Sequence, residues 1–89
     1  KAAKITIKGN VQGVFYREYV REHAERLELK GFVRNIENGN VEVFVEGDIE
    51  KVDEMFNLCK TGPKHAVINS TEMIETSFQD FKNFKVLHI

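Results

Sequence analysis

The sequence predicts a two-layer α+β sandwich in which two helices cover one face of a mostly antiparallel sheet. The chain of 89 residues is long enough for one compact core and no more. Hydrophobic residues make up 42% of it and charged residues 30%, which is an ordinary globular composition. Segments with an apolar period of two alternate with segments in which apolar residues recur every three or four positions. We therefore expect a single domain over residues 1–89.

The chain begins with a predicted strand, a loop and a helix. Ala3–Gly9 alternates Ile5 and Ile7 with polar residues, which is typical of a half-buried strand. Asn10–Val14 contains a glycine and is expected to be a loop. An amphipathic helix is expected next, because apolar side chains then recur at spacings of three and four. These side chains are Tyr16, Val20, His23 or Ala24, and Leu27.

A hairpin is predicted in the middle of the chain. Leu29–Ile36 and Val41–Glu46 are rich in β-forming residues, and Glu37–Asn40 lies between them. Asn38 and Gly39 both tolerate positive φ, which makes this dipeptide a strong hairpin indicator.

A second helix and two further strands complete the predicted elements. Asp48 is a suitable N-cap, and Gly62 with Pro63 ends the helix. The expected apolar stripe of this helix consists of Ile49, Val52, Phe56 and Cys59. The remaining segments are a weaker strand, a loop and a short last strand, at Ala66–Ile74, Glu75–Asn83 and Phe84–Ile89.

The resulting order is β-α-β-β-α-β with an extra C-terminal strand, which is the ferredoxin-like arrangement. A right-handed crossover makes the first two strands parallel and leaves room for another strand between them. Many unrelated functions use this fold, so the function has to be inferred from a site.

Composition excludes several classes of function. The 13 basic and 14 acidic residues give a net charge of −1, which argues against a general nucleic-acid binder. No apolar run approaches the ~18 residues of a membrane span, and no signal peptide is recognisable. Cys59 is the only cysteine, so neither an internal disulfide nor a cysteine zinc site is expected. We expect a cytoplasmic monomer without a metal or cofactor.

The segment from Gly9 to Arg17 is the best candidate for a binding site. It joins a strand to the start of a helix, where backbone N–H groups lack internal partners and attract anions. Gly9 and Gly13 allow the preceding turn to aim further N–H groups into the same space. Arg17 is expected in the first helical turn, where the helix dipole disfavours a positive charge. Its presence there is better explained if a bound anion shares the site. Spacing alone leaves two interpretations open, an anion site or an ordinary connection followed by a surface arginine.

Two motifs make the sequence resemble the acylphosphatase family. The first is G-x-V-Q-G-V-x-F-R, matched here by Gly9, Val11, Gln12, Gly13, Val14, Tyr16 and Arg17. The second is matched by Gly31-Phe-Val-Arg-Asn35, Gly39-Asn-Val41 and Gly47. The passage from Gly62 to Ala66 also resembles the family's segment after its second helix. The resemblance extends over essentially the whole chain.

Two residues depart from the family pattern. Tyr16 replaces the usual Phe or Met, and a buried phenol needs a partner, so we expect its ring to shift or to reach solvent. Ile36 stands where many members have Thr, which removes a hydroxyl beside the site. Both departures bear on the rate more than on the reaction.

The resemblance implies hydrolysis of small acyl phosphates to a carboxylate and inorganic phosphate, without a metal or a covalent intermediate. It implies that Arg17 and Asn35 are the catalytic residues, with Asn35 orienting the attacking water. The implied phosphate-binding residues are Gly9, Asn10, Val11, Gln12, Gly13, Val14, Phe15, Tyr16 and Arg17. Inorganic phosphate is then both product and inhibitor.

Three other interpretations remain. Taken without the family motifs, Asn35 is an ordinary turn former at a strand end. The chain could also be a non-catalytic or carbamoyl-phosphate-specialised module of the same family. An RNA-binding module is the third, because Lys30-Gly31-Phe32 begins its signature, although the residues that follow break it.

Overall fold

A computed structural model describes residues 1–88, except for the side chain of Val14. Its elements follow the predicted order, with a single 3-10 turn, η1, inside the hairpin. They are β1 (Ala2–Asn10), α1 (Val14–Arg26), β2 (Lys30–Asn35), η1 (Glu37–Gly39), β3 (Val41–Glu46), α2 (Ile49–Thr61), β4 (Val67–Thr76) and β5 (Phe84–Leu87). No helix among the described residues is long and apolar enough to cross a membrane.

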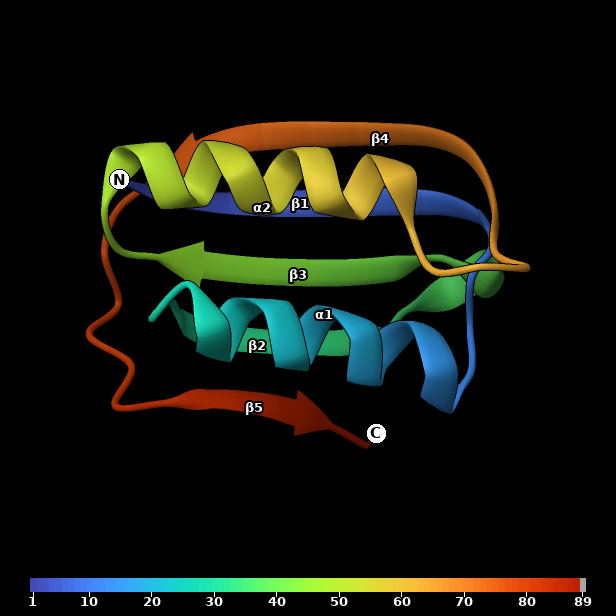
Figure 1. Cartoon of the computed structure of the whole chain (residues 1–89), viewed down its shortest axis with the longest axis horizontal. Coiled ribbons are helices and arrows are strands. Elements are labelled where there is room, and N and C mark those ends of the chain that lie inside the picture. The colour runs from blue at the N-terminus through green and yellow to red at the C-terminus, as the bar shows by residue number, and fades with distance from the viewer. Residues whose placement is uncertain (89) are drawn as a thin grey trace.

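The five strands form one sheet in the order β4-β1-β3-β2-β5, and both helices lie on the same face of it (Figure 1). All neighbouring strands are antiparallel except β2 and β5, which are parallel. β1 and β2 both pair with β3 and therefore run in the same direction, as the predicted crossover requires. The predicted two-layer, ferredoxin-like fold is confirmed.

The core lies between the helices and the sheet. β1 and β3 contribute alternate residues, among them Ile5 and Val43, which are inaccessible to solvent. α2 buries Val52, Met55 and Cys59, so the predicted stripe is only partly correct. Ile49 is 59% exposed. The helix is rotated so that the face centred on Val52 and Cys59 meets the sheet, which leaves Ile49 at the margin of that face.

Several predicted boundaries shift by a few residues. The second strand is shorter than Leu29–Ile36 and ends at Asn35, while the weak strand begins at Val67 and continues to Thr76. Ile36 instead begins the turn, where its N–H donates to the Asn40 carbonyl at 2.9 Å. The part of the last predicted strand that falls on Ile89 lies outside the described residues.

The hairpin turn and the N-cap carry details that the sequence left open. Asn38 and Gly39 have φ of 65° and 79°, which confirms the expected positive φ. The turn is a 3-10 turn longer than a two-residue hairpin loop. Asp48 occupies the predicted N-cap position, but its side chain makes no capping hydrogen bond.

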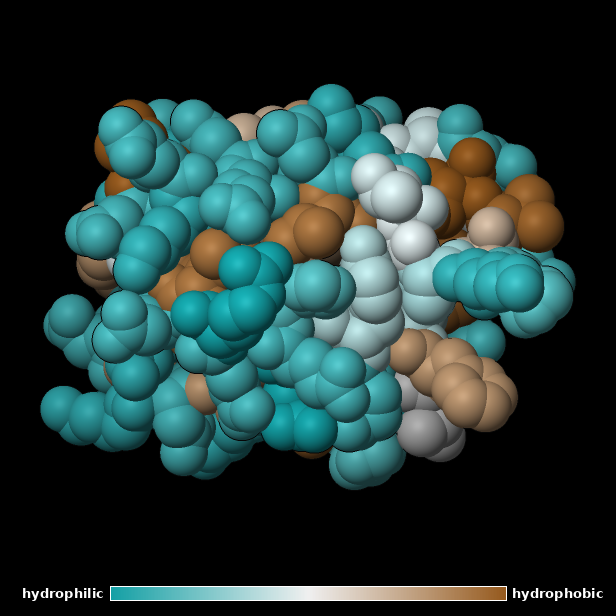
Figure 2. Space-filling view, viewed as in Figure 1, coloured by the Kyte–Doolittle hydropathy of each residue, from teal (hydrophilic) through white to brown (hydrophobic). Residues whose placement is uncertain are grey.

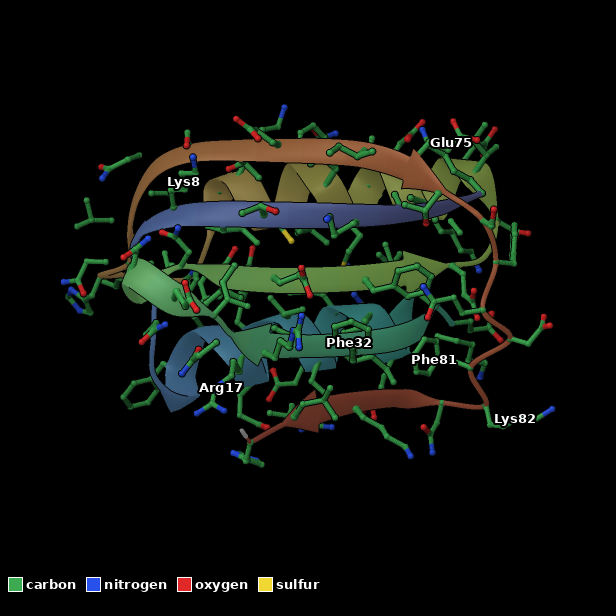
Figure 3. All side chains as sticks on the ribbon, turned by 180° about the vertical axis from the view of Figure 1, so that it is seen from behind. Lys8, Arg17, Phe32, Glu75, Phe81 and Lys82 are labelled. Atoms are coloured by element: carbon green, nitrogen blue, oxygen red, sulfur yellow. The ribbon has the colours of Figure 1, made fainter. Side chains whose placement is uncertain are left out.

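The face of the sheet opposite the helices carries an aromatic cluster. The rings of Phe32 and Phe44 stack at 5.8 Å between centroids, and Phe81 from the segment before β5 lies 5.6 Å from Phe32 (Figure 3). Phe81 therefore packs against Phe32, the ring that an RNA-binding sheet would need to leave exposed for a base. By contrast, the helix face is mostly hydrophilic, with a band of hydrophobic surface between the two helices (Figure 2).

A buried carboxylate fixes this segment to the sheet. Glu46 at the end of β3 is only 4% exposed, and it accepts hydrogen bonds from the backbone N–H groups of Gln79 at 2.7 Å and Phe81 at 2.6 Å. Both amides lie between β4 and β5, so this one side chain orders the connection that leads into the last strand.

Glu46→Ala should lower the free energy of unfolding by about 3 kcal/mol, because two part-buried amides lose a charged acceptor. Glu46→Gln keeps one acceptor and should cost about half as much. Glu42→Ala is the matched control, since Glu42 faces the same side of β3 four residues earlier and forms an ion pair with the half-exposed Arg34. That variant should cost less than about 1 kcal/mol. Urea unfolding measures the free energy of unfolding of all three variants. Equal losses of stability for Glu46→Ala and Glu42→Ala would contradict the proposed role of Glu46 in fixing the segment before β5.

Candidate active site

Two glycines determine the path of the loop between β1 and α1. At the end of β1 the register against β4 shifts between Lys8 and Gly9. A Cβ on Gly9 would lie 2.1 Å from the Val67 carbonyl oxygen, so only glycine permits this close approach. Gly13 has a φ of 126° and nothing within 4 Å of its Cβ position, so it is required for its backbone conformation and leaves open space beside it.

The N-terminus of α1 offers backbone donors to an anion. No side chain caps the helix, and its first turn contains no acidic residue. The bond from the Arg17 N–H to the Gly13 carbonyl is long, at 3.5 Å. The N–H groups at the positive end of the helix dipole therefore lack a side-chain acceptor. This arrangement favours binding of a negatively charged ligand.

Two side chains at this end of the molecule hold unpaired polar atoms. Within residues 1–88, the buried side-chain atoms without a hydrogen-bond partner are Nε of Arg17 and Oδ1 of Asn35. Buried polar groups are nearly always paired, and an unpaired one costs about 1–3 kcal/mol. Such atoms are expected where a ligand or an ordered water completes the site.

The positions of these two residues follow from the secondary structure. Asn35 is the last residue of β2, two positions after Val33, which is fully buried against the helices. Because strand side chains alternate, Asn35 faces the helix side of the sheet. Arg17 lies on the first turn of α1, and its Nη1 is 3.1 Å from Nδ1 of His88, just after β5 (Figure 3).

Gln12 connects the loop to the turn that follows Asn35. Its side-chain amide donates to the carbonyls of Ile36 at 2.8 Å and Asn40 at 3.0 Å. A shallow cavity lies beside this bridge. It is lined by Gln12, Arg34, Asn35, Ile36, Glu37, Asn38, Asn40 and Glu42. The bridge ties the backbone donors of the loop to the end of the sheet that carries Asn35.

Together these groups suit a phosphate monoester or a similar dianion. Backbone N–H groups and a guanidinium bind such an anion, and the Asn35 carboxamide both accepts and donates hydrogen bonds. Within residues 1–88, no group of three or more His, Cys, Asp or Glu is arranged to hold a metal ion.

The sequence model of acylphosphatases matches residues 3–86. The chain belongs to the acylphosphatase family. It is 36% identical over 89 residues to an acylphosphatase of Syntrophus aciditrophicus, covering 99% of this chain and 93% of that one. An acylphosphatase of Coxiella burnetii has a similar structure, with a TM-score of 0.91, 34% identity, and coverage of 97% of this chain and 90% of that one.

A segment of a longer protein is similar as well. The structure of full-length HypF in its phosphate- and nucleotide-bound form matches with a TM-score of 0.90 and 32% identity. The match covers 98% of this chain but only 12% of HypF. The similarity to acylphosphatases over nearly their whole length supports an enzyme of that type.

The predicted phosphate-binding residues are contiguous in the chain, but their side chains have different surroundings. Val11 is 2% exposed and belongs to the core, whereas Phe15 is 87% exposed. Asn10 is exposed at the end of β1, and the side chain of Val14 lies outside what the structure describes. Of these residues, Gln12 directs its side-chain amide toward Ile36 and Asn40, and Arg17 directs its guanidinium toward His88.

Sequence reasoning missed two contacts of the site. His88 was expected only as a member of the last strand, and Gln12 only as one of the phosphate-binding residues. The contact of His88 with Arg17 spans 71 positions in the sequence, and that of Gln12 with Ile36 spans 24. Contacts over such separations cannot be inferred from a local sequence pattern.

Tyr16 anchors the start of α1 to α2. Its ring is 3% exposed, and its hydroxyl donates to the Cys59 carbonyl at 2.9 Å. The expectation that the ring would reach solvent is wrong, because the end of α2 supplies a backbone acceptor for the buried hydroxyl. Burial raises the pKa of the Tyr16 phenol well above its usual range, and it raises the pKa of the Cys59 thiol to about 12.

Tyr16→Phe should lower the free energy of unfolding by about 1 kcal/mol at neutral pH, because the buried Cys59 carbonyl loses its donor. Wild-type stability should also fall as the pH rises above about 10, where the unfolded state loses the phenolic proton and the folded state keeps it. Tyr16→Phe removes this contribution, so its stability should decline less between about pH 8 and about pH 11.

Tyr19→Phe serves as the matched control, since the half-buried Tyr19 hydroxyl donates to the Leu58 carbonyl at 2.8 Å. Water can replace this bond, so the variant should resemble wild type more closely. Urea unfolding over the pH range measures both variants. A decline in Tyr16→Phe as steep as in wild type would contradict the buried, protonated phenol.

Proposed function

We propose that the chain hydrolyses small acyl phosphates to a carboxylate and inorganic phosphate, with Arg17 and Asn35 as the catalytic residues. The observation that carries this proposal is the pair of unpaired buried atoms, Nε of Arg17 and Oδ1 of Asn35, beside an uncapped helix N-terminus. Membership of the acylphosphatase family supports the same reaction.

The loop and Arg17 hold the phosphoryl group. The substrate phosphate carries two negative charges near neutral pH, which match the positive helix end and the guanidinium. Nε of Arg17 has no partner within residues 1–88, so it can donate to a phosphoryl oxygen without breaking a bond seen there. Phosphoryl transfer spreads charge over these oxygens in the transition state, so fixed donors contribute most of the stabilisation.

Asn35 orients the attacking water. Its Oδ1 accepts a hydrogen bond from the water, whose oxygen then attacks phosphorus in line with the leaving carboxylate. The new P–O bond forms as the bond to the acyl oxygen breaks, and the proton released by the water goes to the phosphate. The products are a carboxylate and dihydrogen phosphate. A carboxylate leaves without protonation, so neither a general acid nor a covalent intermediate is required.

A second candidate function is that of a carbamoyl-phosphate-specialised module within a longer protein. The similarity to a segment that makes up 12% of HypF supports the second half of this proposal, a place within a longer protein. Phosphate release from acetyl phosphate and from carbamoyl phosphate distinguishes the two candidates. Rapid hydrolysis of acetyl phosphate supports the first, and activity confined to carbamoyl phosphate supports the second.

Arg17→Ala should lower kcat/KM for acetyl phosphate by a factor of about 10²–10³, because a charged donor to the phosphoryl oxygens is lost. Arg17→Lys should recover little of this, since an ammonium lacks the planar fork. Arg21→Ala is the matched control, because Arg21 lies one turn further on the same helix and pairs with Glu18 and Glu25. Inorganic phosphate should inhibit wild type competitively and Arg17→Ala much more weakly. Near-native turnover by Arg17→Ala would disprove the assignment.

Asn35→Ala should lower kcat by about 10²–10³ while the inhibition constant for phosphate changes little, because a water-orienting group acts mainly in the transition state. Asn35→Asp should also be slow, since its carboxylate repels the phosphoryl group and lacks the N–H donor. Asn69→Ala, an exposed position on β4, is the control. Single-turnover hydrolysis of acetyl phosphate measures kcat directly. Retained activity in Asn35→Asp would indicate a general base instead.

A further inference from the structure

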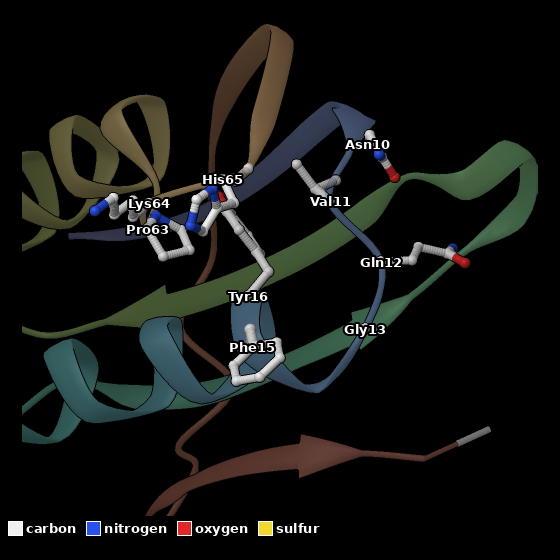
Figure 4. Close-up of a pocket in the computed structure, with 10 residues that line it drawn as sticks. Asn10, Val11, Gln12, Gly13, Phe15, Tyr16, Pro63, Lys64 and His65 are labelled. Carbon is white, nitrogen blue, oxygen red and sulfur yellow. The ribbon is translucent and has the colours of Figure 1, made fainter.

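A second cavity of about 350 Å³ lies beside the loop that precedes α1 (Figure 4). Its walls come from this loop, from the start of α1 and from the segment between α2 and β4. The lining residues are Asn10, Val11, Gln12, Gly13, Phe15, Tyr16, Pro63, Lys64, His65 and Ala66. The volume exceeds the roughly 150 Å³ of an apolar cavity that is known to hold a benzene ring.

The loop separates this cavity from Asn35. Gln12 and the loop backbone border both cavities, but the Gln12 side chain points toward η1, away from Phe15 and His65 (Figure 4). In-line displacement requires the attacking water and the leaving group on opposite sides of phosphorus. With the water held by Asn35, the leaving acyl group must extend away from that residue. Gly13 borders the second cavity and has no side chain to block the way.

The lining suits an apolar acyl group. Phe15, near the start of α1, is a large aromatic that is 87% exposed, whereas Val11 in the loop and Tyr16 in the helix are buried. Pro63 and Ala66 add apolar lining from the segment between α2 and β4, and hydrophobic surface gathers at this end of the molecule in Figure 2. Among the described residues, no carboxylate lines the cavity, and Lys64 and His65 are its only titratable groups apart from the Tyr16 phenol. An acyl group with a positive charge would therefore find no counter-ion.

We propose that this cavity is the acyl-group subsite and that the preferred substrates carry an aromatic or branched apolar acyl group, packed between Phe15 and the segment from Pro63 to Ala66. The inference rests on the proposed hydrolysis of acyl phosphates. It assigns to Phe15 a side-chain contact with substrate in addition to any backbone contact with phosphate.

The experiment compares benzoyl phosphate with acetyl phosphate, whose methyl group is too small to fill the cavity. Wild type should have a kcat/KM for benzoyl phosphate at least about tenfold higher, since apolar pockets discriminate by about 10-fold or more per buried group. Ala66→Leu narrows the cavity and should reduce this ratio about tenfold, mainly through KM for benzoyl phosphate. Ser70→Leu is the matched control, because Ser70 is exposed on β4 and does not line the cavity.

A second variant tests the proposal independently in case Ala66→Leu does not fold. Phe15→Ala removes the exposed ring without creating a buried cavity, and it too should reduce the benzoyl-to-acetyl ratio. The phosphate inhibition constant reports an intact loop in each variant. A ratio near one in wild type, or a ratio unchanged by both variants, would overturn the subsite while leaving the hydrolase function intact. Failure to hydrolyse either substrate would overturn both proposals.

Discussion

The parallel course of β1 and β2 on either side of β3 is the constraint on which the rest of the structure depends. Strands that run in the same direction end at the same edge of a sheet, so the loop after β1 and the last residue of β2 meet there. The loop leads into the N-terminus of α1, and β2 ends at Asn35. Gln12 closes the gap with hydrogen bonds to Ile36 and Asn40 across the turn. The topology thus brings a positive helix end and a carboxamide to one place.

The site and its support differ in how completely their polar groups are satisfied. Behind the loop, the Tyr16 hydroxyl is paired with the Cys59 carbonyl, and on the far face Glu46 receives two backbone donors. At the site, by contrast, Arg17 and Asn35 each keep one buried atom that has no partner in the described part of the chain. Unpaired buried atoms reduce stability, so the well-paired surroundings allow the fold to tolerate them. This contrast distinguishes the proposed active site from other clusters of polar residues in the chain.

The loop before α1 has a different role on each of its two sides. Toward η1 it presents Gln12, and toward the segment between α2 and β4 it borders the second cavity together with Phe15 and Tyr16 at the start of α1. A phosphate held by the loop would have a polar surface on one side and a largely apolar one on the other. An acyl phosphate likewise has a polar end and a less polar end. Water attacks the phosphorus at the polar end, and the acyl group forms the other end. In this proposal the geometry of in-line displacement relates the two cavities to one reaction.

Local patterns in the sequence determined the order of the elements, the positive φ at Asn38 and Gly39, and the family to which the chain belongs, because each depends on residues that are close together in the chain. The two motifs also selected Arg17 and Asn35. The tertiary structure alone decided which face α2 buries, how the Tyr16 hydroxyl is paired and which side chains join the loop to the sheet edge. Those features depend on contacts across 24 to 71 positions, as between Gln12 and Ile36 or Arg17 and His88, and only the packing of the helices against the sheet creates them.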